Sequence, residues 1–449
     1  MKQVESLKAP GWLQRIELIL TPIGYWERAF ESHPEAFWAK GVDWGSPLMM
    51  FYTPQAVQQI IENRDKHLGI VSFPGELTAI FGNNSVATSE GDRHQIFRKI
   101  LMPPLHGKQV HNYGKLICEI THQVMQELPI NQPFLAWEVA QDITLQVLIK
   151  ILFGSAQKER YQQIKNLIVS LLNLFAAKTA RFPLLRFFPK VLGHRNFGQK
   201  FLQIRQQIEQ LSYAEITERR TCIEPDKTDM LSLLMLFRDE HGHPLTDVEI
   251  LDNLLLLLST GNESTTAAIC WLWYCVYRNP EIQEKLLQEI ENLGDFSNPN
   301  SFYRLPYLTA VCNETLRMYP ITMFILPRGV NTPTEIAGYK LQPGNLVSIS
   351  NYLLHRQENL YPEPSKFKPE RFIERQFSAY EFIPFGGGIR NCIGAELALY
   401  LMKLILVTTV SEYQLVLANK QPVKPQSRNA NLAPIALQLV KHSNSKNMT

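Results

Sequence analysis

The feature that most constrains the fold of this 449-residue chain is one long apolar segment, Asp247 to Tyr277. Five consecutive leucines, Leu254 to Leu258, help to make it apolar around its whole circumference. A helix of that kind belongs in the core of a large protein, so the rest of the chain has to surround it. A transmembrane role is disfavoured because Asn253, Asn262 and Glu263 interrupt the apolar run.

A polar group lies in the middle of this segment, from Thr260 through Gly261 to Thr265. Glycine and consecutive hydroxyl residues inside a helix can loosen the i to i−4 hydrogen bonds and open a groove for a ligand or water. The acid Glu263 is followed directly by the alcohol Ser264, an order suited to passing protons. We therefore predict that Glu263, Ser264 and Thr265 are catalytic. The alternative interpretation is a capped kink with a surface glutamate.

A second feature is a glycine-rich stretch around one cysteine, Phe385-Gly386-Gly387-Gly388-Ile389-Arg390-Asn391-Cys392-Ile393-Gly394. Glycines allow positive φ and close approach to a neighbour or a flat ligand. Cys392 lies where the loop enters a helix-like run, and unsatisfied backbone N–H groups and the helix dipole stabilise a thiolate there. With Arg390 two residues before it, the thiolate suits a metal cofactor that carries its own carboxylates. The alternative is a glycine-rich turn with a buried cysteine.

Charged residues elsewhere occur in pairs at helical spacing. On the predicted helix from Asp92 to Met102, His94 and Arg98 are four residues apart and share one face. Such a pair can bind two anionic groups together, although a solvated helix face is the alternative. Glu314 and Arg317 are three apart and can form an ion pair.

These motifs occur in the order and spacing of the cytochrome P-450 family, which the chain resembles from about Val42 to Leu439. The central helix resembles the oxygen-activating motif of that family, with Glu263 as its acid. Ser264 stands where threonine is usual, and Thr260 stands where alanine is usual. The five fixed positions of the family's cysteine loop are filled by Phe385, Gly388, Arg390, Cys392 and Gly394.

The resemblance implies haem b (iron protoporphyrin IX) as the cofactor, with Cys392 as the axial iron ligand. It makes Phe385 and Gly388 further cofactor-binding residues of the loop. It implies four partners for the haem propionates, namely His94, Arg98, Arg328 and Arg390. It also implies a structural network for folding and haem retention, formed by Glu314, Arg317 and Arg371.

The implied fold class is mainly α with small β-sheets (α+β), with the long central helix over the haem in a single domain of residues 1–449. The last residues, Lys441 to Thr449, are predicted to be disordered. Strands are predicted near Val42 and Trp44 and over Leu48–Tyr52, Thr334–Lys340, Leu346–Ser350 and Leu415–Leu417.

Composition limits the partners and the compartment. The net charge is 45 minus 42, or +3, which is too small to indicate nucleic acid binding. Six cysteines without a CxxC pair indicate reduced thiols in a cytoplasmic protein. The N-terminus carries no apolar run of about 20 residues, so no transmembrane anchor is predicted. The segment from Leu13 to Ile23 is either an ordinary amphipathic helix or a contact with a membrane surface.

The implied activity is insertion of one oxygen atom of O2 into a fatty acid, alkane or terpenoid. A separate ferredoxin or flavodoxin with its reductase would supply the electrons. Two alternatives stay open: a haem-thiolate enzyme that uses peroxide or rearranges oxygenated lipids, and a haem carrier or gas sensor. The acid–alcohol pair favours the oxygen-dependent enzyme. The apolar residues expected around the substrate are Phe73, Leu77, Ile80, Phe81, Leu257, Ile325, Leu326 and Leu432.

Overall fold

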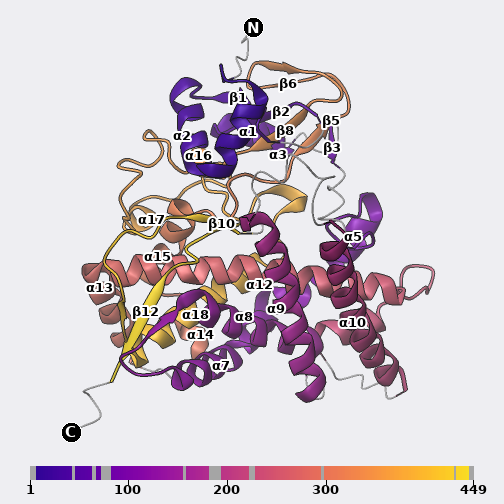
Figure 1. The fold of residues 1–449 in the computed structure, drawn as a ribbon, viewed down its shortest axis with the longest axis vertical. Coiled ribbons are helices and arrows are strands. Elements are labelled where there is room, and N and C mark those ends of the chain that lie inside the picture. Colours follow the sequence, from indigo (N-terminus) through magenta and orange to yellow (C-terminus); the bar gives the residue numbers. More distant parts are fainter. Residues whose placement is uncertain are drawn as a thin grey trace.

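The structure is a computed structural model, and it describes residues 7–42, 46–62, 67–71, 82–154, 158–181, 194–221, 228–294, 298–428 and 431–443. Helices form most of it and surround one long helix, α12 (Figure 1). The helical elements are α1 (Gly11–Leu20), α2 (Pro22–Ser32), α3 (Pro54–Glu62), α5 (Gly91–Leu101), α6 (Gly107–Asn112), α7 (Gly114–Glu127), α8 (Ala136–Phe153), α9 (Lys158–Arg181), α10 (His194–Thr221), α11 (Met230–Leu236), α12 (Asp247–Arg278), α13 (Pro280–Glu291), α14 (Pro299–Phe302), α15 (Pro306–Met318), α16 (Asn351–Leu354), α17 (Arg371–Glu374) and α18 (Ala395–Glu412), with 3-10 turns η1 (Pro103–Leu105) and η3 (Gly388–Arg390).

The strands form small sheets. A five-stranded sheet has the order β1-β2-β8-β5-β3, in which only β2 and β8 are parallel. A three-stranded sheet has the order β4-β12-β9, and β6–β7 and β10–β11 are hairpins. The predicted class, mainly α with small sheets, is confirmed. The strands are β1 (Ala36–Trp38), β2 (Leu48–Phe51), β3 (Leu68–Ile70), β4 (Pro133–Leu135), β5 (Arg328–Val330), β6 (Thr334–Ile336), β7 (Tyr339–Leu341), β8 (Leu346–Ile349), β9 (Gln414–Leu417), β10 (Gln426–Arg428), β11 (Asn431–Ala433) and β12 (Gln438–His442).

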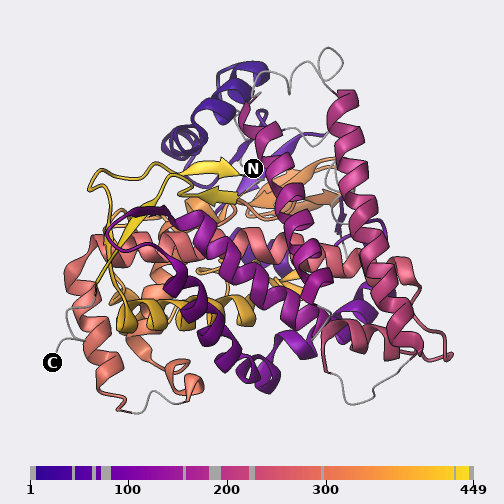
Figure 2. The same ribbon diagram turned by 60° about the horizontal axis from the view of Figure 1, so that its bottom comes forward.

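The central helix begins at a capping box. The Thr246 hydroxyl accepts from the Glu249 N–H at 3.3 Å, and the Glu249 carboxylate accepts from the Thr246 N–H at 2.9 Å. All five leucines from Leu254 to Leu258 are buried, as the helix prediction requires. Helices α8, α15 and α18 pack against α12 (Figures 1 and 2). Within the described residues, no helix is long and apolar enough to cross a bilayer.

A second core lies under the five-stranded sheet, at the top of Figure 1, where α1, α2 and α16 cover it. Its centre is aromatic: the rings of Trp26 and Phe37 meet edge to face with centroids 5.7 Å apart. Arg328 is the first residue of β5 in this sheet, which gives its backbone a rigid support.

Three local predictions are wrong. The first strand of the large sheet is β1, and Val42 lies in the turn after it, while Trp44 falls outside the described residues. The predicted strand over 334–340 is the β6–β7 hairpin, because Ala337 and Gly338 have φ of +49° and +86° and turn the chain. The predicted disordered tail begins too early.

Strand β12 continues through Lys441 and His442, which belong to that predicted tail. The Lys441 ammonium is buried and donates to Met125 O at 2.8 Å, so a backbone acceptor satisfies it. Residues 444–449 lie outside the described part of the chain.

Candidate active site

The cysteine loop runs from Phe385 to the start of α18 and is closed by its own backbone. The Cys392 N–H donates to Phe385 O at 2.9 Å. Gly386 and Gly388 have φ of +70° and +67°, the left-handed region that favours glycine. Gly387 lies against α3, where an added Cβ would clash with the side chain of Ile61. The local structure therefore requires glycine at each of these three positions.

The Cys392 thiol is exposed to a water-sized probe, yet the surrounding protein removes much of its hydration. Burial raises the pKa of the thiol, and a backbone N–H from Gly394 and the charge of Arg98 offset this only in part. The predicted lowering of its pKa is therefore wrong for the protein alone, because desolvation outweighs the helix start.

Helix α5 brings the predicted pair His94 and Arg98 next to the cysteine loop. His94 is buried, one turn before Arg98. The Arg98 guanidinium donates to Asn391 O at 2.9 Å and to Asn391 Oδ1 at 2.7 Å. Arg98 is thereby fixed beside the residue that precedes Cys392.

The other two predicted anion-binding arginines have different surroundings. Arg390 donates to Ser89 O at 2.6 Å and to Val86 O at 3.3 Å, and so ties the cysteine loop to the segment before α5. For Arg328, no hydrogen bond or ion pair from the guanidinium is found within the described residues, and burial lowers its pKa. Arg328 is thus a desolvated cation without a visible counter-charge.

The polar group of α12 has one open side. Thr260 is exposed although most of α12 around it is buried, so open space lies next to the helix there. The Ser264 hydroxyl donates to Thr260 O at 2.7 Å, and the Thr260 hydroxyl donates to Leu256 O at 2.6 Å. The helix is continuous through this region, so the predicted loosening of its ladder is not observed. Thr265 is buried.

Glu263 is held by a residue that sequence reasoning missed. Its side chain is 3% exposed, so the surface-glutamate interpretation is wrong. Arg428, the last residue of β10, donates from Nε to Glu263 Oε1 at 3.2 Å. Arg428 also donates to Asn173 Oδ1 on α9 at 2.7 Å and stacks on the Trp137 ring at 4.7 Å. No motif in the sequence marks Arg428.

The predicted contacts among Glu314, Arg317 and Arg371 are confirmed. Arg317 donates to both Glu314 carboxylate oxygens, at 2.7 and 2.9 Å, and Arg371 Nε donates to Oε1 at 3.1 Å. All three side chains are buried. Arg317 also donates to His355 O at 2.8 Å, and His355 Nε2 accepts from the Ile383 N–H at 3.0 Å. The network therefore reaches the chain two residues before the cysteine loop.

The residues expected around a substrate are only partly described. Phe73, Leu77, Ile80 and Phe81 lie outside the described residues. Leu257 and Leu432 are buried, Ile325 is half-buried and Leu326 is exposed. Leu432 is fixed by its backbone, which donates to Ile321 O at 2.7 Å and accepts from the Trp271 indole at 2.8 Å.

These features fit a metal cofactor with its own anionic groups. Within the described residues, no cluster of three His, Cys, Asp or Glu side chains that could hold a metal ion is found. In the described part of the chain Arg328 has no counter-charge, and a positive metal next to Cys392 would stabilise its thiolate. The donor set therefore suits a flat cofactor with carboxylates.

Comparison with known proteins gives one family. The cytochrome P-450 family model matches residues 41–441. A putative cytochrome P-450 137 from Mycobacterium tuberculosis is 29% identical over 365 residues, which are 80% of this chain and 73% of that protein. A putative cytochrome P-450 135A1 from the same species is 25% identical over 395 residues, 87% of this chain and 84% of that protein.

Two solved structures share the fold. A cyanobacterial CYP120A1 with bound retinoic acid has a TM-score of 0.82 and 22% identity, covering 96% of both chains. The haem domain of cytochrome P-450DA has a TM-score of 0.82 and 19% identity, covering 94% of this chain and 93% of that chain. At these identities the likeness concerns the fold alone.

Proposed function

Because this chain belongs to the cytochrome P-450 family of haem-dependent monooxygenases, we propose that it inserts one oxygen atom of O2 into a lipophilic small molecule. The proposed electron donor is a separate ferredoxin or flavodoxin with its reductase. The observation that carries the proposal is the accessible, desolvated Cys392 thiol at the start of α18.

We propose haem b as the cofactor, whose iron Cys392 would hold from a loop that Phe385 and Gly388 shape. A haem with a thiolate ligand supplies O2 activation, because the sulfur donates electron density that favours O–O cleavage. The Gly394 N–H bonds the sulfur, and Arg98 places positive charge near it. Both interactions stabilise the thiolate form of Cys392 and tune its donor strength.

His94, Arg98, Arg328 and Arg390 are the proposed partners of the cofactor carboxylates. Arg328 has the strongest support, because a carboxylate would supply a counter-charge that the described residues do not provide for this desolvated cation. Arg98 and Arg390 already bind oxygen atoms of nearby chain segments, which orients both guanidinium groups.

Glu263, Ser264 and Thr265 are the proposed proton relay. Glu263 would take up a proton at its carboxylate when its bond to Arg428 opens, and Ser264 Oγ would pass it to the open side of α12. Thr265, buried next to them, is the third proposed member. Arg428 is a positioning residue in this scheme, since it acts through Glu263.

The same ion pair gives the peroxide-using alternative its support. An acid held by an arginine delivers protons less readily, whereas a peroxide-driven or lipid-rearranging enzyme needs no relay from Glu263. The two functions differ in their oxidant.

One reaction would receive isotopically labelled O2 with a ferredoxin system, and a second would receive peroxide alone. The label would then be followed in the product. Product without label, formed only with peroxide, would reject the oxygen-dependent proposal.

The substrate class is proposed from the apolar residues near the site, Leu257, Ile325, Leu326 and Leu432. The retinoic acid bound by the cyanobacterial structure supports including isoprenoid acids among the candidates. Spectral titration with fatty acids, alkanes and terpenoids would follow displacement of iron-bound water. Failure of every lipophilic compound to shift the spectrum would exclude this class.

We also propose that α1 rests on a membrane surface. Trp12, Leu13 and Leu20 are 60%, 41% and 66% exposed on this helix, and the basic residues Lys8 and Lys40 are exposed nearby. An apolar helix face with basic neighbours suits an anionic lipid surface. Sedimentation with anionic vesicles should fall in a Trp12→Ser, Leu20→Ser double variant, and equal sedimentation would reject the contact.

A further inference from the structure

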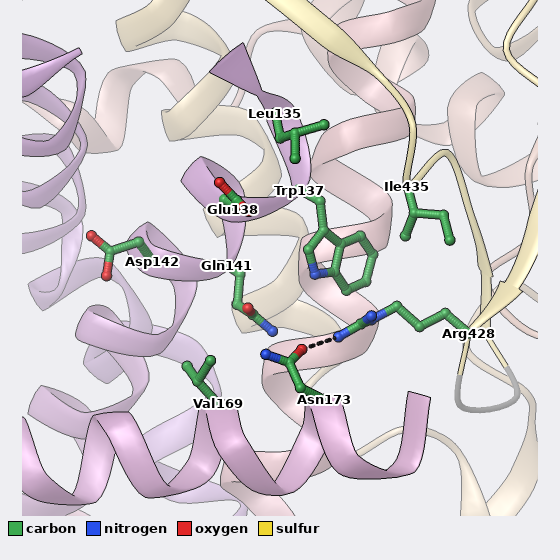
Figure 3. Close-up of a pocket in the computed structure, with 9 residues that line it drawn as sticks. All are labelled: Leu135, Trp137, Glu138, Gln141, Asp142, Val169, Asn173, Arg428 and Ile435. Atoms are coloured by element: carbon green, nitrogen blue, oxygen red, sulfur yellow. Dashed lines mark hydrogen bonds between the residues drawn. The ribbon is translucent and has the colours of Figure 1, made fainter. Parts of the chain in front are cut away.

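We propose that the cleft between α8, α9 and the β10–β11 hairpin binds a small carboxylate with an apolar body (Figure 3). Its volume of about 460 Å³ lies within the usual range for small-molecule pockets. The inference starts from three polar side chains that line this cleft, Trp137, Asn173 and Arg428.

Trp137 supplies a buried donor without an acceptor. The side chain is 5% exposed, and no partner for its indole Nε1 is found within the described residues. Figure 3 shows this nitrogen turned toward Gln141 and Asn173 in the cleft. A buried N–H without a partner costs free energy, so an acceptor that a ligand brings would be favourable.

Arg428 supplies the charge. Its Nε donates to Glu263 and its Nη2 to Asn173, while no hydrogen bond of Nη1 is found in the described part of the chain. Because the Asn173 oxygen accepts from Arg428, the Asn173 amide nitrogen lies on the opposite side, toward Val169 and Gln141 in Figure 3. The three donors together suit a carboxylate.

The other lining residues support the same orientation. Leu135, Val169 and Ile435 line the cleft from different sides and offer apolar contacts to the body of the ligand. The acids Glu138 and Asp142 also line the cleft, but their carboxylates point away from Trp137 and Arg428 in Figure 3. Asp142 is neutralised by an ion pair with Lys165 and accepts from Gln146 at 3.0 Å.

The site shares Arg428 with Glu263, so the two carboxylates would compete for one guanidinium. Binding would therefore strengthen when the charge of Glu263 is removed, and a bound carboxylate would loosen the hold on Glu263. A looser hold on Glu263 would affect proton supply only if Glu263 belongs to the proposed relay, so that consequence rests on the proposed function. The binding itself does not, so it is measured without turnover.

The test is equilibrium dialysis of labelled benzoate against the haem-loaded protein, with benzamide as the neutral control. We expect saturable benzoate binding that leaves the haem spectrum unchanged, is weakened about tenfold in Trp137→Phe and is lost in Arg428→Gln. Glu263→Gln should bind several-fold more tightly. Arg278→Gln removes another arginine that stacks on an aromatic ring, 5.5 Å from Tyr274, and should bind like the unaltered protein.

Three results would overturn the proposal: no saturable binding, equal binding of benzamide, or benzoate binding that shifts the haem spectrum and persists in Arg428→Gln. If Arg428→Gln does not fold, Trp137→Phe and Glu263→Gln decide the question, since the proposal requires opposite changes in affinity. Failure of monooxygenation with normal benzoate binding would reject the proposed function alone.

Discussion

Arg428 and Glu263 are 165 residues apart in the chain and form a largely buried ion pair, with Nε 3.2 Å from Oε1. The pair connects the C-terminal hairpin to the polar group of the central helix. The pair holds the acid that the proposed relay requires. No local sequence pattern indicates that β10, which carries Arg428, lies next to Glu263.

This pair can be measured by a double-mutant cycle. Arg428→Gln removes the guanidinium from a buried carboxylate and should lower the free energy of unfolding by about 3 kcal/mol. Glu263→Gln and the double variant complete the cycle in urea unfolding, where we expect a coupling of about 1–3 kcal/mol. Additive losses would mean that the pair contributes no coupling.

Replacing Cys392 should remove thiolate ligation without removing the fold. In Cys392→Ala, the reduced carbon monoxide complex should lose the long-wavelength band that a thiolate-ligated haem gives. Cys392→Ser, which keeps the side-chain size, is the matched variant, and Cys312→Ser changes a buried cysteine far from the loop in sequence. A band that survives in Cys392→Ala and disappears in Cys312→Ser would reassign the ligand.

Arg328→Leu should have opposite effects on the haem-free and the haem-loaded protein. Removing a desolvated cation, for which no counter-charge is found among the residues that the structure describes, should stabilise the haem-free protein by about 1 kcal/mol. It should also accelerate haem loss, because a propionate partner is gone. Unfolding midpoints and haem transfer to a competing apoprotein measure the two effects, with Arg328→Lys as the charge-keeping control. A destabilised haem-free protein would contradict the argument.

The Glu314 network predicts a ranking of variants. Glu314→Leu leaves two buried guanidinium groups without their carboxylate and should cost about 3–5 kcal/mol. Arg371→Met should cost less, about 1–3 kcal/mol, because Glu314 keeps both bonds from Arg317. Urea unfolding gives the ranking, and equal costs would show that Arg371 and Glu314 act as one unit.

His355 predicts a pH dependence. Burial, and then the charges of Arg317 and Arg356, hold the pKa of His355 well below its ordinary value. As pH falls below about 6.5, the unfolded chain takes up a proton that the folded protein refuses, so stability falls by up to about 1.4 kcal/mol per pH unit. His355→Asn keeps an acceptor for the Ile383 N–H and should flatten this slope between pH 7 and 5. An unchanged slope would assign the titration to other groups.

Much of the site was predictable because local chemistry determines it. The cysteine loop needs glycine at positive φ at two positions, so its pattern is visible in the sequence. Glu314 and Arg317 face each other because helical spacing alone places them together. The central helix is predictable because an apolar surface on every side requires burial.

The tertiary structure decided two properties that depend on groups far apart in sequence, namely the pKa of Cys392 and the pairing of Arg428 with Glu263. The pKa of the Cys392 thiol depends on how much protein surrounds it, and that desolvation outweighs the local N–H groups used in the prediction. Arg428 meets Glu263 only because the hairpin lies against α12, a contact between segments far apart in sequence. The sequence alone thus determined which groups the site contains and the local backbone that presents them. Their burial and pairing depend on long-range packing, which no spacing rule encodes.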